Sequence, residues 1–295
     1  MSVLEIKNLT KSYGPIRAVD NLNLSIEAGQ IYGILGPNGS GKTTTLGMIT
    51  SVLKPDSGTY QWFSGSESQP LKKIGTILET PNFFPYLTAD ENLEIIRHIK
   101  GTPNKDFTEI LQLVNLDGRR NSKFASYSLG MKQRLAIAAT MIGDPDVLIF
   151  DEPTNGLDPQ GIADVRNTLQ KVASSGRTVI LASHILDEVE KICTHVAIIK
   201  KGKLLATGSV GSILSNDKTI EVASLGESAL ENWLRGNPSI QSFEKKGFFF
   251  DCVVAEDFNV ARMSEEMSRA GIYPTHLVER KKKLEEEFLE ITSKS

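Results

Sequence analysis

The sequence predicts an α/β protein built around a parallel sheet. Residues 147–150 are four consecutive apolar residues, and residues 178–181 form a second short run, in which one threonine precedes three apolar residues. Such unbroken runs are typical of strands that are buried on both faces, as in a parallel sheet. A third apolar run at residues 31–35 leads into a glycine-rich turn and then into a helical pattern.

The bulk composition is that of an ordinary globular protein. Its 295 residues suffice for one large domain or two ordinary ones, and a net charge of −3 gives no sign of nucleic-acid binding. No apolar run reaches the roughly 18 residues of a membrane span, and the first residues lack the apolar core of a signal peptide. Cys193 and Cys252 are too few and too far apart for a disulfide framework. We therefore expect a cytoplasmic location.

The N-terminal region predicts a half-buried sheet. Apolar and polar residues alternate at 3–6 and 22–26, which is the period of strands with one face in solvent. We expect the intervening residues 10–15 to form a turn. Tyr13 lies in this turn, and from the residues alone it is interpreted as a half-buried strand-end aromatic rather than as a platform for an adenine ring.

The glycine-rich turn matches the pattern G-x-x-x-x-G-K-[ST] without a mismatch. Its glycines allow backbone conformations that a Cβ would forbid, so that successive N–H groups can face a phosphate. Lys42 supplies a cation for the β- and γ-phosphates, and the Thr43 hydroxyl is placed to bind Mg²⁺. The alternative, a turn without a chemical role, is disfavoured between a strand and a helix. We therefore expect a nucleoside triphosphate to bind at Gly36, Pro37, Asn38, Gly39, Ser40, Gly41, Lys42, Thr43 and Thr44.

A helical insertion is predicted at about residues 83–142, after a strand at 74–78. Thr88 and Glu91 form a capping box at the start of its first helix, and the pattern stays helical throughout. Ser128 and Gly130 precede an apolar helix within the insertion. They form either a second anion site or an ordinary N-cap.

Two acidic residues end the apolar run 147–150. Asp151 and Glu152 would be costly to bury there without a cation or a proton. Asp151 can hold Mg²⁺ beside Thr43, and Glu152 can orient or deprotonate a water that faces the γ-phosphate. The alternative is that both acids are simply exposed at a strand end. His184 follows the next buried strand, and on the ligand side of a parallel sheet a γ-phosphate contact is the better interpretation.

The pattern changes after a hairpin predicted at residues 196–206. The residues that follow predict strand, helix, strand, strand, helix and strand, which suggests a small ferredoxin-like module. The charged run 279–287 is interpreted as a solvated helix face. We expect a nucleotide-binding domain at 1–215 and an accessory α+β domain at 217–295.

Residues 1–215 resemble the ATP-binding subunit of an ABC transporter. The motifs occur in that family's order and spacing: Tyr13, GPNGSGKTT as Walker A, YSLGMKQR as the signature, VLIFDEP as Walker B, GLD as the D-loop, and His184. The resemblance implies a P-loop NTPase fold, in which a RecA-like parallel core carries an antiparallel β subdomain and a helical insertion. It also implies that Tyr13 stacks on adenine and that His184 is the switch histidine.

The same resemblance implies a pair of chains. In that family two copies close head to tail, and each ATP lies between Walker A of one copy and the signature of the other, here Ser128 and Gly130. Asp158 of the D-loop joins this nucleotide site. Closure drives an integral membrane permease, so the chain is expected to lie on the inner face of the cell membrane through that partner. ATP and Mg²⁺ are the implied cofactors, and no nucleic acid is expected.

Two residues depart from the common pattern. Met131 stands where the signature usually has glutamine, and Glu79 replaces the glutamine after the third core strand, keeping an oxygen for Mg²⁺. Both departures look like exporter subunits of the bacitracin-resistance and lantibiotic-immunity group. We therefore expect an ATPase that energises an ABC-2-type exporter of antimicrobial peptides or drugs. The alternatives are an importer subunit, a soluble ABC ATPase of translation or DNA repair, and a scaffold that binds ATP without turnover.

Overall fold

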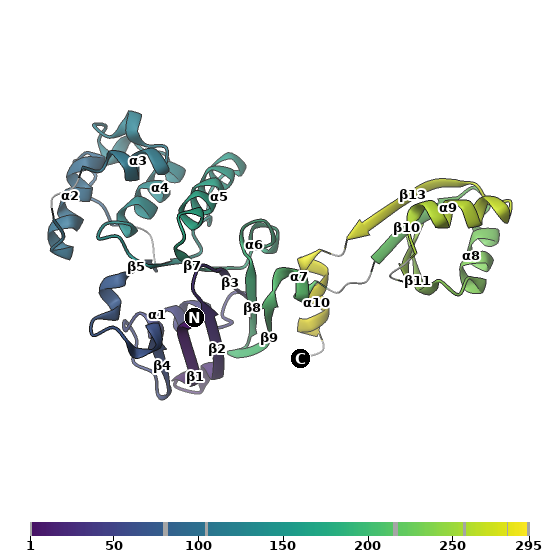
Figure 1. The fold of residues 1–295 in the computed structure, drawn as a ribbon, viewed down its shortest axis with the longest axis horizontal. Coiled ribbons are helices and arrows are strands. Elements are labelled where there is room, and N and C mark those ends of the chain that lie inside the picture. The colour runs from purple at the N-terminus through teal and green to yellow at the C-terminus, as the bar shows by residue number, and fades with distance from the viewer. Residues whose placement is uncertain are drawn as a thin grey trace. The chain divides into compact units, whose positions relative to one another are not determined.

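The computed structural model describes most of the chain, namely residues 2–78, 82–103, 106–214, 218–255, 258–281 and 283–293. The chain forms two compact units (Figure 1), one that runs to Val210 and one over Gly211–Ser293. Each unit has its own hydrophobic core. No helix in the described ranges is both long and apolar enough to cross a membrane.

A six-stranded sheet forms the centre of the first unit and confirms the predicted parallel sheet. Its strands lie in the order β5-β6-β7-β3-β8-β9, and only the β8–β9 pair is antiparallel. β6 and β7 are buried almost throughout, as expected for strands covered on both faces. The strands are β3 (Ile31–Leu35), β5 (Ile74–Ile77), β6 (Val147–Asp151), β7 (Thr178–Ser183), β8 (His195–Lys200) and β9 (Lys203–Ser209).

A three-stranded antiparallel sheet, in the order β2-β1-β4, shares the core of the first unit. The turn predicted at residues 10–15 is confirmed only at Gly14 and Pro15, because the first strand continues to Tyr13, which pairs with Ile16. Pairing with the next strand satisfies the backbone groups of this stretch, so the hairpin stays in strand conformation almost to its tip. The strands are β1 (Ser2–Tyr13), β2 (Ile16–Glu27) and β4 (Ser57–Trp62).

The segment between β5 and β6 carries three helices. The predicted capping box is confirmed, since the side chains of Thr88 and Glu91 each bond to the other residue's backbone N–H. The segment is not helical throughout, because Gly101 ends one helix in the left-handed conformation and Asn115 adopts that conformation after the next. The helices from α1 to α7 are α1 (Lys42–Ile49), α2 (Ala89–Lys100), α3 (Thr108–Leu113), α4 (Leu129–Thr140), α5 (Pro159–Ser174), α6 (Leu186–Ile192) and α7 (Val210–Ile213). Short 3₁₀ helices are η1 (Phe63–Gly65), η2 (Pro70–Lys73), η3 (Asp117–Arg119) and η4 (Phe124–Ser126).

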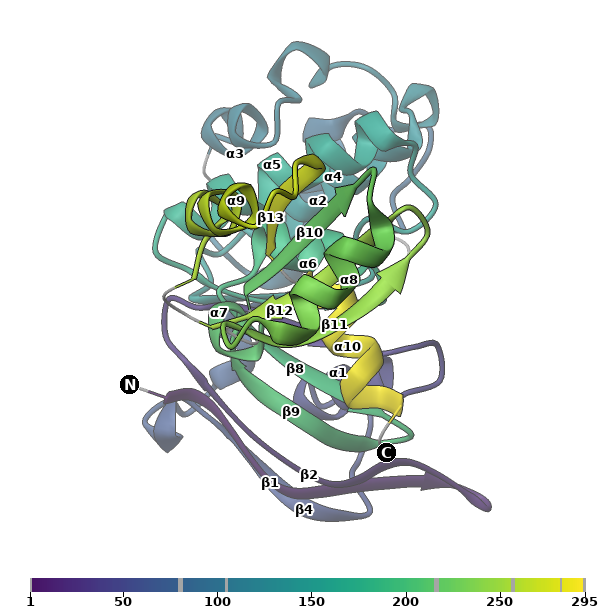
Figure 2. The same ribbon diagram turned by 90° about the vertical axis from the view of Figure 1, so that its right-hand side faces the viewer.

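The second unit is a four-stranded antiparallel sheet with two helices on one face (Figure 2). Its elements follow the order β-α-β-β-α-β before a last helix, and its strands lie in the order β11-β12-β10-β13. The charged run 279–287 is not one helix face, because β13 reaches Lys281 and α10 begins at Leu284. The elements are β10 (Lys218–Ser224), α8 (Glu227–Gly236), β11 (Ile240–Lys246), β12 (Phe249–Val254), α9 (Val260–Arg269), β13 (Pro274–Lys281) and α10 (Leu284–Ser293).

The two cysteines are not bonded to each other. Both are free and buried. Burial raises the pKa of the Cys252 thiol to about 12, and burial also raises the pKa of Cys193. Neither thiol is therefore a reactive thiolate near neutral pH.

Candidate active site

The carboxyl ends of three neighbouring strands bring the predicted residues together. β7 lies between β6 and β3, and all three strands are parallel. β3 leads into the glycine-rich loop, β6 ends in Asp151 with Glu152 next, and His184 follows β7. In open α/β sheets, ligands bind outside this end of the strands.

The loop at residues 36–41 requires glycine at two positions. A Cβ on Gly36 would lie 2.2 Å from the carbonyl oxygen of Ile199. Gly41 has a φ of +105°, and a Cβ there would lie 2.2 Å from the carbonyl oxygen of Ala18. Any side chain at either position would push the loop away from the sheet. The helix that follows, α1, has no side-chain cap and no acidic residue in its first turn, so its first N–H groups remain available to an anion.

Lys42 is a buried cation whose side chain bonds to the backbone of the loop. Its Nζ donates to the carbonyl oxygens of Gly36 at 2.8 Å and Pro37 at 3.4 Å. It also lies 3.3 Å from Oε1 of Glu152. Since the lysine is only 5% exposed, these oxygens replace most of the water that would otherwise solvate its charge.

Glu152 is held at both oxygens of its carboxylate. While Oε1 faces Lys42, Oε2 lies 2.8 Å from Nδ1 of His184. The backbone of Glu152 has a φ of +47°, which is uncommon for a residue with a Cβ. Its N–H donates to the carbonyl oxygen of Ala182 in β7 at 3.0 Å. The structure thus joins Lys42, Glu152 and His184 in one chain of contacts.

Asp151 has the features of a magnesium ligand. Burial raises the pKa of its carboxyl. A hydrogen bond from the Thr43 hydroxyl and the charge of Lys42 lower this pKa in part, whereas the charge of the neighbouring Glu152 raises it further. The Oδ1 atom of Asp151 is buried and has no hydrogen-bond partner among the described residues. One hydroxyl and one carboxylate suit Mg²⁺, which usually binds through one or two carboxylates together with waters and phosphate oxygens. The residues present therefore fit this ion. The third predicted ligand, Glu79, lies outside the described residues.

Tyr13 and the signature residue Ser128 are not part of this contact chain. Tyr13 is 47% exposed near the tip of the β1–β2 hairpin, and the Lys11 ammonium lies 5.8 Å from the centre of its ring. Ser128 is the N-cap of α4, and its Oγ accepts from the N–H of Met131 at 3.3 Å. Within the described part of the chain, neither residue contacts Lys42, Glu152 or His184.

Asp158 and Gly130 lie where two helices approach each other. Asp158 is exposed and caps α5, where its Oδ1 accepts from the N–H of Gly161 at 2.9 Å. A Cβ on Gly130 would lie 3.5 Å from Cα of Gly161. The start of α4 is therefore packed closely against the start of α5.

The sequence does not predict that one acidic residue, Glu188, is buried. Glu188 in α6 is 5% exposed and shares a hydrogen bond with Thr154, which lies just beyond Glu152. Burial raises the pKa of Glu188. This contact ties the helix that follows His184 to the turn that follows Glu152. A glutamate on a short charged helix gives no signal of burial, since such residues are almost always exposed.

Comparison with known proteins gives matches over both parts of the chain. A family model described as ABC transporter matches residues 19–155. The chain is 33% identical to the bacitracin transport ATP-binding protein BcrA of Enterococcus faecalis, over 97% of this chain and 95% of the relative. It is 38% identical to the lantibiotic transport ATP-binding protein SrtF of Streptococcus pyogenes, over 69% of this chain and 89% of the relative.

Solved structures match most of the length of the chain. A crystal structure of an ABC transporter ATP-binding cassette in its ADP conformation matches with a TM-score of 0.64 and 26% identity, over 72% of this chain and 92% of that one. A dimeric structure of a bacterial ABC transporter cassette matches with a TM-score of 0.61 and 28% identity, over 70% and 98%. These matches confirm the predicted P-loop NTPase fold.

Proposed function

This chain belongs to the family of ABC transporter ATP-binding proteins, and from that membership we propose that it powers a membrane exporter of peptide antibiotics. As a member of this family it binds and hydrolyses ATP. The observation that supports our assignment of the catalytic residues is the contact chain Lys42–Glu152–His184 at the ends of parallel strands. A protein that bound ATP without turnover would have no need of a carboxylate held between these two residues.

We assign the triphosphate to residues 36–44, with the N–H groups at the start of α1 facing its oxygens. On binding, Lys42 exchanges its contacts with loop carbonyls and Glu152 for oxygens of the β- and γ-phosphates. The Ser40 hydroxyl is buried and has no partner in the described ranges, so it can bond to the ligand. The half-exposed ring of Tyr13 offers a flat apolar surface to the adenine.

Glu152 is assigned as the base that takes a proton from the attacking water. Nδ1 of His184 lies 2.8 Å from its Oε2 and keeps the carboxylate in place. The move of Lys42 towards the phosphates leaves Oε1 available to the water, and a positioned base contributes about 10²–10⁴-fold to the rate. Thr43 and Asp151 would hold Mg²⁺, which when bound neutralises charge on the β- and γ-phosphates. Glu79 is proposed as a further ligand of the ion.

A second copy of the chain completes the site in this proposal. Ser128 is exposed, and its described contacts lie within its own helix. A head-to-tail pair would bring Ser128, Gly130 and Asp158 of one copy to the ATP held by the other. The description of a solved relative as dimeric supports the pairing.

We infer the direction of transport and the cargo class from the names of relatives. Two are named bacitracin and lantibiotic transport ATP-binding proteins, and a third, of Ralstonia nicotianae, is named a Nod factor export ATP-binding protein. We propose an ABC-2-type exporter in which this chain lies on the cytoplasmic side, bound to an integral membrane permease. Phe84 and Tyr86 are 45% and 64% exposed and lie next to each other, which makes them a candidate contact with the permease.

A resistance assay tests this function. A strain that lacks the gene is challenged with a panel of peptide antibiotics and complemented with either the wild-type protein or Glu152→Gln. We expect wild type to restore growth against at least one of them and Glu152→Gln to fail. Equal growth of the deletion strain and its parent on every antibiotic would contradict the proposed cargo class.

A further inference from the structure

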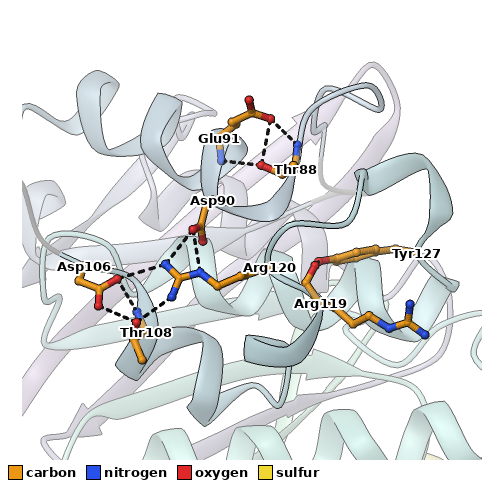
Figure 3. A network of polar contacts seen from close by, with 8 residues as sticks. All are labelled: Thr88, Asp90, Glu91, Asp106, Thr108, Arg119, Arg120 and Tyr127. Atoms are coloured by element: carbon orange, nitrogen blue, oxygen red, sulfur yellow. Dashed lines mark hydrogen bonds and ion pairs between the residues drawn. The ribbon is translucent and has the colours of Figure 1, made fainter.

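The loop that precedes the signature helix is held by one arginine side chain. The Arg120 guanidinium contacts Asp90 at the start of α2, Asp106 just before α3 and Thr108 at the start of α3 (Figure 3). Its Nε lies 2.8 Å from Oδ2 of Asp90, Nη1 lies 2.8 Å from Oγ1 of Thr108, and Nη2 lies 3.2 Å from Oδ1 of Asp106. A second contact, from Nη2 to the same Oδ2 of Asp90 at 2.7 Å, places two donors of the guanidinium on one carboxylate oxygen.

The backbone beside Arg120 is fastened at two further points. The carbonyl oxygen of Arg120 accepts from the N–H of Ala89 at 3.1 Å. The carbonyl oxygen of Arg119 accepts from the hydroxyl of Tyr127 at 2.8 Å. Tyr127 is buried and directly precedes Ser128. Through the backbone of Arg119 and Arg120, the contacts of the Arg120 side chain therefore also help to fix Tyr127, the residue next to the signature serine.

The far end of the same loop is bonded to the chain that leads into α2. The N–H of Phe124 donates to the carbonyl oxygen of Leu87, and the N–H of Ala125 donates to that of Pro85, both at 2.8 Å. The loop at residues 119–127 is therefore attached to the start of α2 at both of its ends.

We infer that Arg120 is a positioning residue for the signature serine, Ser128. The inference rests on the proposed function, because Ser128 acts there on the ATP of a second copy. Arg120 joins segments that are distant in sequence, and only a planar guanidinium offers enough donors in fixed directions to bond to all of them. A displacement of about 1 Å at a reacting group costs about 100-fold in rate. A looser loop before Ser128 therefore slows hydrolysis without disturbing the Lys42 loop.

Arg120→Lys tests the inference, with Arg119→Lys as the matched control. Arg119 is exposed, and its guanidinium makes no hydrogen bond or ion pair with any described residue. The measurements are ATP affinity at protein concentrations too low for pairing, kcat, thermal stability, and ATP-dependent pairing in the Glu152→Gln background. We expect Arg120→Lys to lower kcat about tenfold and to weaken pairing, with ATP affinity within about twofold of wild type. Arg119→Lys should behave as wild type, and Asp106→Asn should fall between the two.

A double variant separates positioning from support of the fold. If Arg120 acts through Ser128, then Arg120→Lys should add little to the loss caused by Ser128→Ala. Additive losses would overturn the inference, as would a wild-type kcat in Arg120→Lys. A parallel fall in ATP affinity and thermal stability would overturn it too, since it would show a purely structural role. A wild-type protein that neither hydrolyses ATP nor pairs would instead refute the proposed function itself.

Discussion

At the scale of single residues, the ion pair between Lys42 and Glu152 gives opposite predictions for its two members. Glu152→Gln should keep ATP binding, lower turnover by about 10²–10⁴-fold and accumulate a nucleotide-bound dimer. Lys42→Ala should lose ATP affinity and leave Glu152 without its cation. Because pairing depends on bound ATP, no dimer should form. Phosphate release and size-exclusion chromatography with ATP measure both effects. Turnover near the wild-type rate in Glu152→Gln would show that another group is the base.

Asp151 allows a prediction in which stability and activity change in opposite directions. Because burial raises its pKa, the folded protein binds a proton at Asp151 more tightly than the unfolded chain does. Its contribution to stability therefore falls as pH rises from the unfolded pKa to the folded pKa, and above both values the buried charge is a constant cost. Asp151→Asn removes that cost.

The nucleotide-free Asp151→Asn protein should therefore unfold at a higher temperature than wild type at pH 7.5, while Mg²⁺-dependent ATP hydrolysis is lost. The difference in unfolding temperature should shrink as the pH is lowered. Thermal unfolding from pH 8 down to about pH 4, near the ordinary pKa of aspartate, without nucleotide, measures this. An equal or lower unfolding temperature at every pH would mean that contacts to the charged carboxylate outweigh its burial.

At the scale of elements, the start of α2 depends on its capping box. Thr88→Ala removes the side chain that accepts from the N–H of Glu91, and loss of such a cap costs about 1 kcal/mol of stability. Glu91→Gln is the matched control, because glutamine can fill the same role in a capping box. Urea unfolding of both variants measures the difference. A larger loss in Glu91→Gln than in Thr88→Ala would contradict this account.

Sequence alone predicts the features that depend on residues close together in the chain. The capping box and the glycine-rich loop are local patterns, and the meeting of Glu152 with His184 follows from the rule that parallel strands end at one edge. The turn expected at residues 10–15 was confirmed only at Gly14 and Pro15, because pairing with β2 extends the first strand to Tyr13. The contacts of Arg120 could not be predicted, since its partners lie far away in the sequence and ordinary surface arginines look the same. Glu188 was missed for a similar reason, as only the packed fold shows that it is buried.

At the scale of the whole molecule, we propose that residues 1–215 form the nucleotide-binding domain and 217–295 an accessory domain. The compact units divide at Val210, and the last strand of the six-stranded sheet ends at Ser209. A chain that ends after residue 215 should therefore bind ATP with an affinity within about threefold of the full-length protein, since no core strand is cut. Equilibrium binding to both proteins is the measurement. An insoluble or nucleotide-blind shorter chain would show that the accessory domain completes the first unit.

The buried cysteines make the intact protein suitable for energy-transfer spectroscopy. Since both of its thiols are enclosed and protonated, dyes that react with thiolates should leave the native chain unlabelled. A cysteine introduced at Gly118, where a Cβ meets no atom within 4 Å, would then carry the dye alone. Donor- and acceptor-labelled copies could follow the approach and separation of two chains during each ATP cycle, without replacing any native cysteine.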